Sequence, residues 1–60
     1  MKETKKFVEK QANFIVECAV KNDWSISYAT DFAESYLRKY PYSDSFILKV
    51  QQLVVKELIG

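Results

Sequence analysis

The first residue of this chain that could do chemistry is its one thiol, Cys18. A nucleophilic cysteine needs a base or a positive charge beside it to favour the thiolate, and the sequence contains no histidine. Cys18 also falls between Ile15 and Ala19, on the apolar side of a predicted helix. We therefore interpret Cys18 as a small hydrophobic core residue. A single cysteine without histidine also predicts no intrachain disulfide and no structural zinc site.

A pair of carboxylates, Asp31 and Glu34, is the second candidate for chemistry. General acid–base catalysis needs such a pair in a shielded cleft that shifts their pKa values. Here both residues fall on the polar face of a predicted helix, and Arg38 follows Glu34 by four positions. This spacing favours an exposed ion pair. We therefore expect no catalytic residues, no cofactor and no enzymatic activity.

Aromatic residues recur at every fourth position in the middle of the chain: Tyr28, Phe32, Tyr36 and Tyr40. A second row beside them, Ala29, Ala33 and Leu37, has smaller side chains. The spacing places both rows on one broad face of a helix. The aromatic row could be core, a stacking platform for single-stranded nucleic acid, or a docking face for a partner. We favour core over partner contact by at least one tyrosine. Because a spacing of four advances the row by ~40° per step, Tyr28 and Tyr40 cannot both be central to one core.

Two further aromatic residues, Trp24 and Tyr42, fall in the predicted connections between helices. Each could cover the core or anchor a partner, because Trp and Tyr combine a large apolar body with one polar group. The candidate partner contacts predicted from the sequence are Trp24, Tyr28, Tyr40 and Tyr42.

Three helices account for nearly the whole chain of 60 residues, which we treat as a single all-α domain over residues 1–60. Apolar residues spaced by three or four predict helices over about 4–21, 25–40 and 44–59. Asp23, Ser25 and Ser27 are alternative N-caps for the second helix, with Ser25 preferred, and Ser43 is the N-cap of the third. Pro41 ends the second helix, because proline disfavours helical geometry in the residue before it.

Each predicted helix is apolar over a wider arc than a small monomer needs. A surface helix needs a little over ~100°, whereas these helices show roughly 180–200°. A chain this short buries only ~60% of its unfolded surface, so a second subunit would add needed core. We therefore predict a homodimeric helical bundle with a shared core. The predicted dimer interface consists of Leu48, Val55, Ile59, Val16 and Val20.

Charge gives little support to nucleic-acid or membrane binding. The formal net charge is +1, and the one basic cluster, Lys2, Lys5, Lys6 and Lys10, is diluted by Glu3 and Glu9. No apolar run approaches the ~20 residues that span a bilayer, and we expect a cytoplasmic protein. The preferred function is a small non-enzymatic protein–protein interaction module, an adaptor or regulator acting as a homodimer. The alternative is a nucleic-acid-binding regulator that uses the basic N-terminal end of the dimer.

Overall fold

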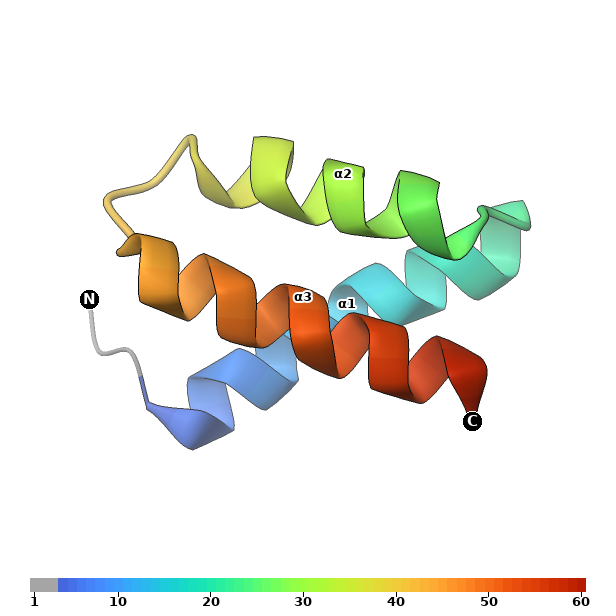
Figure 1. Cartoon of the computed structure of the whole chain (residues 1–60), viewed down its shortest axis with the longest axis horizontal. Helices are drawn as coiled ribbons and strands as arrows, with labels where there is room; N and C mark the ends of the chain where they lie inside the picture. The colour runs from blue at the N-terminus through green and yellow to red at the C-terminus, as the bar shows by residue number, and fades with distance from the viewer. Residues whose placement is uncertain (1–3) are drawn as a thin grey trace.

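The computed structural model describes residues 4–60, and three α-helices occupy most of that range. They are α1 (Lys5–Asn22), α2 (Ile26–Leu37) and α3 (Asp44–Ile59). α2 and α3 lie side by side and run in opposite directions, and α1 crosses behind α3 (Figure 1). Residues 4–60 contain no strand. The predicted all-α, three-helix architecture is therefore confirmed.

A hydroxyl side chain caps the start of each helix. The backbone N–H of Phe7 donates to Thr4 Oγ1 at 3.2 Å, that of Tyr28 to Ser25 Oγ at 3.1 Å, and that of Phe46 to Ser43 Oγ at 3.1 Å. Each bond satisfies one of the donors that a helix N-terminus leaves free. The predicted caps Ser25 and Ser43 are confirmed, while Thr4 is a cap and not the first helical residue.

The end of α1 turns on Asp23, which has left-handed backbone angles, φ 56° and ψ 43°. The N–H of Asp23 donates to Val20 O at 3.4 Å, and the N–H of Trp24 donates to Ala19 O at 2.9 Å. This pair of bonds is a Schellman motif, in which the left-handed position is usually glycine. The motif fixes the backbone of Trp24 against the last turn of α1.

The second helix ends at Leu37, not at Tyr40 as predicted. Beyond Leu37 the backbone hydrogen bonds join residues three apart instead of four. Lys39 N–H donates to Tyr36 O at 3.4 Å, and Tyr40 N–H donates to Leu37 O at 3.1 Å. Pro41 follows directly, and its ring restricts the backbone of Tyr40 to extended or turn geometry. The effect of the proline therefore reaches back through the last turn.

The core lies between α3 and the two other helices, which contact each other less than either contacts α3. Four of its residues are alanines, and small side chains let helix backbones approach closely. Larger side chains, among them Phe46, Ile15, Leu37, Val50 and Val54, fill the remaining space with less than 2% exposure. The buried set is Val8, Ala12, Ile15, Ala19, Ala29, Ala33, Leu37, Phe46, Ile47, Val50 and Val54.

Two polar links join α2 to α3. The side-chain amide of Gln51 donates to Thr30 O at 2.9 Å. At the other end of α2, Arg38 contacts Glu34 at 3.3 Å and Asp44 at 2.8 Å. The predicted Glu34–Arg38 pair is confirmed, and Asp44 extends it across the connection. Since these charged groups are about half exposed or more, the pairs add little stability.

Candidate protein-interaction surfaces

The nine aromatic residues of the chain form one connected network of ring contacts. Five contacts trace the network along α2 and its two ends: Trp24–Tyr28 at 4.9 Å, Trp24–Phe32 at 4.8 Å, Phe32–Tyr36 at 5.7 Å, Tyr36–Tyr40 at 5.7 Å and Tyr40–Tyr42 at 6.0 Å. Ring centroids at 4.5–7 Å are in the range of favourable aromatic pairs. The predicted aromatic row is therefore contiguous, and Trp24 and Tyr42 extend it at its two ends.

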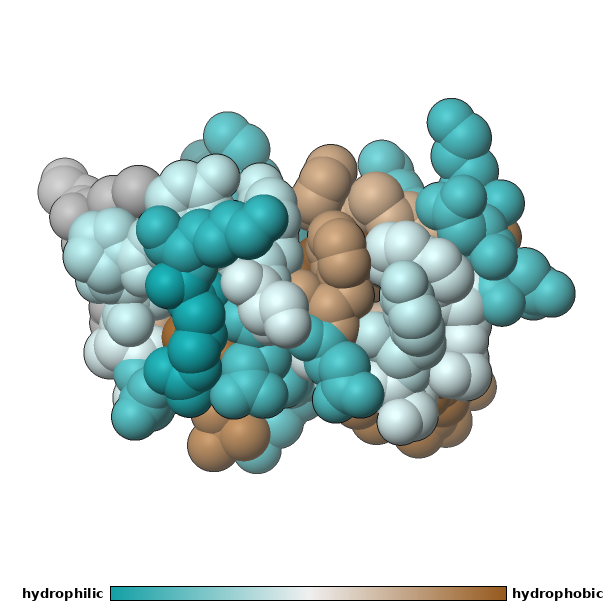
Figure 2. All heavy atoms as spheres, turned by 90° about the horizontal axis from the view of Figure 1, so that it is seen from above, coloured by the Kyte–Doolittle hydropathy of each residue, from teal (hydrophilic) through white to brown (hydrophobic). Residues whose placement is uncertain are grey.

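Phe14 brings α1 into this network, because its ring lies 5.6 Å from that of Tyr36. We call the six residues along this α1–α2 seam the aromatic surface: Phe14, Trp24, Tyr28, Phe32, Tyr36 and Tyr40. Phe14, Tyr28 and Tyr40 are 44%, 56% and 42% exposed, and the other three are half-buried. Seen from the α2 side, hydrophobic side chains run from the upper edge to the middle of the molecule, with pale side chains of intermediate hydropathy beside them (Figure 2).

The four predicted partner contacts have different surroundings. Tyr28 and Tyr40 are exposed, and Trp24 is half-buried against Tyr28 and Phe32. Tyr42 is also half-buried, and its ring stacks on the buried Phe46 at 4.3 Å. Tyr42 therefore belongs mainly to the edge of the core, while the other three residues lie on the aromatic surface.

The expectation that the aromatic row is core is wrong for its ends and only partly right for its middle. The smaller row, Ala29, Ala33 and Leu37, forms the core and is 0% exposed. Phe32 and Tyr36 pack against its edge. Only one stripe of a helix can point directly into the core. On α2 this is the smaller row, whose alanines let α2 approach α3 closely. The aromatic rings consequently fill the flank of α2 that faces α1.

Three of the predicted dimer-interface residues share one stripe of α3. Leu48 and Val55 line a hollow of 370 Å³ together with Thr30, Gln51 and Gln52, and Ile59, 72% exposed, continues the same stripe one turn beyond Val55. We call Leu48, Val55 and Ile59 the α3 stripe.

Val16 and Val20, the other two predicted interface residues, lie on α1. They are about 120–160° around α1 from Phe14, at about 100° per residue, so they face away from α2. Val20 is 70% exposed, whereas Val16 packs against the core. The dimer interface of these five residues stays a prediction.

The residues considered for chemistry lie on two different helices. Cys18 is half-buried, less enclosed than predicted, and Asp31 and Glu34 are exposed on α2. Hydrogen bonds to Asp44 and to Glu34 raise the pKa of Arg38. Burial, and then hydrogen bonding with Tyr40, raises the pKa of Tyr36. Within residues 4–60, no three metal-ligating side chains come together.

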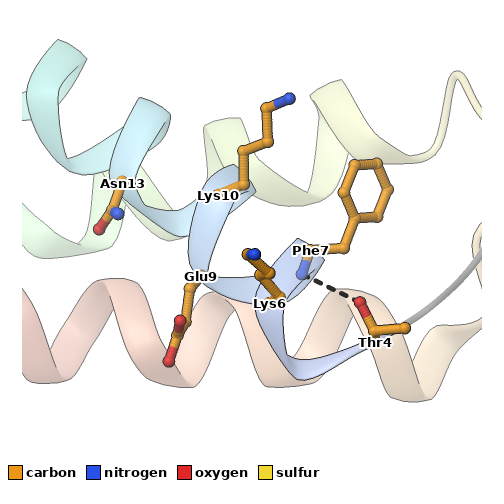
Figure 3. Close-up of a pocket in the computed structure, with 6 residues that line it drawn as sticks. All are labelled: Thr4, Lys6, Phe7, Glu9, Lys10 and Asn13. Atoms are coloured by element: carbon orange, nitrogen blue, oxygen red, sulfur yellow. Dashed lines mark hydrogen bonds between the residues drawn. The ribbon is translucent and has the colours of Figure 1, made fainter.

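The first turns of α1 border an open hollow of 570 Å³, lined by Thr4, Lys6, Phe7, Glu9, Lys10 and Asn13. Lys10 and Glu9 extend in opposite directions from the helix (Figure 3). The ring of Phe7 instead contacts Tyr42 and Phe46, each at 5.9 Å. With diverging charges of both signs, these side chains do not converge on a ligand. Lys5, Lys6 and Lys10 of the predicted basic cluster are exposed, while Lys2 and Glu3 lie outside the described residues.

Compared with known protein families, curated proteins and solved structures, the chain matches none of them. No helix within residues 4–60 is long and apolar enough to cross a membrane.

The main residue of the aromatic surface that the sequence analysis missed is Phe14. Helical spacing could have identified it, because Phe14 shares one side of α1 with Phe7 and Cys18. That side is distinct from the buried stripe, which consists of Val8, Ala12, Ile15 and Ala19.

Proposed function

We propose that this protein is a small non-enzymatic interaction module that binds a partner protein through the aromatic surface. The observation that carries the proposal is the continuity of this surface, since three exposed rings are linked through three half-buried ones. Exposed apolar patches of this kind mark binding sites on proteins, and Tyr and Trp are enriched among the residues that dominate interface energies. The half-buried rings also hold the exposed ones in place, which lowers the entropy lost on binding.

We further propose that the module is a homodimer that pairs through the α3 stripe. Leu48 is 54% and Ile59 is 72% exposed, and the stripe borders a hollow that apolar side chains of a second copy can fill. Fully burying a Leu, Ile or Val side chain contributes ~1.5–3 kcal/mol. Two partly exposed stripes that bury each other therefore contribute several kcal/mol. This is comparable with the total stability of a 60-residue domain at about 0.05–0.15 kcal/mol per residue.

The test of partner binding compares the wild-type protein with the double variant Tyr28→Ala/Tyr40→Ala. Each protein is immobilised and exposed to extract of its source cells, and retained proteins are identified by mass spectrometry. We expect at least one protein to be retained by the wild type and lost from the variant. The double variant Glu9→Ala/Lys49→Ala, with two exposed changes away from the aromatic surface, should retain it. If both variants retain the same proteins as the wild type, the aromatic surface is not the binding site.

A further inference from the structure

One part of the aromatic surface forms a hollow with a carboxylate in it. Tyr28, Asp31, Phe32 and Ser35 line a space of 300 Å³, at the lower end of the range for small-molecule sites. Their spacing of three, four and seven places them on one stripe of α2. Trp24 supports both rings, with centroids 4.9 Å from Tyr28 and 4.8 Å from Phe32. Three aromatic rings and one carboxylate are therefore gathered at the N-terminal half of α2.

Among the described residues 4–60, Asp31 has no ion-pair partner. The helix Ile26–Leu37 contains no lysine or arginine, and within residues 4–60 no cation lies within ion-pair distance of Asp31. The other carboxylate of the helix, Glu34, is already paired with Arg38. The hollow thus offers ring faces and one uncompensated negative charge, which together are complementary to a cation.

We propose that this hollow binds the arginine side chain of a partner protein. A guanidinium group is planar, so it can stack on the ring of Tyr28 or Phe32 while its N–H groups donate to the carboxylate of Asp31. An arginine also loses less hydration than a lysine when it enters such a site. The proposal rests on the proposed function, because it names the chemistry of the partner residue that the aromatic surface recognises.

The experiment uses a capped Gly-Arg-Gly peptide as the probe and ¹H–¹⁵N NMR spectra of the full chain as the readout. Trp24 is the only tryptophan, so its indole signal reports on the hollow without ambiguity. We expect saturable shifts at Trp24, Tyr28 and Phe32 in the millimolar range. The same peptide with citrulline, which has the shape of arginine without its charge, should bind at least about threefold more weakly.

Two variants and one control separate the parts of the site. Asp31→Asn removes the charge, and Phe32→Leu keeps apolar volume while removing the ring face. Each variant should bind the arginine peptide about threefold more weakly than the wild type does. Glu17→Gln removes one negative charge from an exposed position on α1 and should leave the affinity unchanged. Far-ultraviolet circular dichroism confirms that each variant is folded.

Several results would overturn the proposal. They are equal binding of the arginine and citrulline peptides, an Asp31→Asn variant with wild-type affinity, and tighter binding of the matching lysine peptide or of tetramethylammonium. The last result would assign the hollow to a different cation. If these peptide tests fail while Tyr28→Ala/Tyr40→Ala still loses a retained protein, only the arginine assignment is wrong. If the peptide tests succeed and that variant loses nothing, the wider interaction surface is wrong.

Discussion

The two flanks of α2 are built from different kinds of side chain. Toward α3, the fully buried Ala29, Ala33 and Leu37 let α2 pack closely against its neighbour. Toward α1, the seam is filled by rings, and Phe14 and Tyr28 remain 44% and 56% exposed. Close packing of small and branched side chains stabilises the fold, whereas partly exposed rings keep apolar surface available for binding. In the proposed function, the row toward α3 supplies stability and the adjacent row toward α1 supplies recognition.

The largest effect is expected when the same change, Phe→Ala, is made in each of the two regions. Phe46 is 1% exposed, so Phe46→Ala should cost about 3–5 kcal/mol of unfolding free energy through lost burial and a cavity. This is most of the stability expected for a domain of 60 residues. Phe14→Ala, at 44% exposure, should cost only about 1 kcal/mol. Urea denaturation followed by circular dichroism measures both.

If Phe14→Ala proves as destabilising as Phe46→Ala, the aromatic seam is a second core, and the division between the two flanks of α2 is wrong.

The next largest effect is expected at the α3 stripe, which the dimer proposal assigns to self-association. Val55→Asp would place an unpaired charge from each copy in the interface, so it should convert a dimer to a monomer. Val55 is half-buried, and the helices should remain folded. Its neighbour Val54, 0% exposed, provides the contrast, because Val54→Asp should unfold the chain. Sedimentation equilibrium and circular dichroism separate these outcomes. A Val55→Asp protein that stays dimeric would exclude the α3 stripe as the interface.

Much of the fold was predictable because its signals are local. The hydroxyls of Ser25 and Ser43 and the three- and four-residue spacing of apolar residues placed the helices to within one residue, except at the end of α2. That end depends on how far Pro41 disturbs the preceding turn, which the spacing of Tyr36 and Tyr40 does not reveal.

The candidate surfaces were harder to predict because they depend on which flank of each helix faces which neighbour. The contact of Phe14 with Tyr36 and the pairing of Arg38 with Asp44 both join different helices. The sequence pattern marks an apolar face on each helix but does not fix the arrangement of three helices around one another.

A smaller effect is expected where α1 turns toward α2. Asp23 occupies a left-handed conformation with φ 56°, which glycine adopts without steric cost. Asp23→Gly should therefore raise the unfolding free energy by about 0.5–1 kcal/mol, partly offset by the greater flexibility of glycine in the unfolded chain. Thermal denaturation measures the change, and Asp23→Ala, which lacks this freedom, should destabilise the protein. A destabilised glycine variant would mean that the aspartate side chain itself holds the connection between the two helices.

The smallest expected effect is the response of the aromatic seam to high pH. Burial and the hydrogen bond with Tyr40 raise the pKa of Tyr36 above its ordinary value, which is about 10. As the pH rises, the unfolded chain therefore loses this proton before the folded protein does. The contribution of Tyr36 to the stability of the folded protein is complete below about pH 10, and it is lost as the pH rises through the pKa of the folded protein. The free energy of unfolding, measured at a series of pH values, should fall less at alkaline pH for Tyr36→Phe than for the wild type. If the free energy of unfolding depends on pH in the same way in both proteins, Tyr36 lies in a water-like environment.

The most direct test of the account is the mass of the wild-type protein in solution. In the proposed arrangement, the α3 stripe pairs with a second copy and the aromatic surface stays free for a different partner. Sedimentation equilibrium across micromolar concentrations should therefore give a mass near 14 kDa, twice that of the 7.0 kDa chain. The Trp24 indole signal should show no change in environment between dimer and Val55→Asp monomer. A mass of 7.0 kDa at every concentration, or a dimer that buries Trp24, would contradict it.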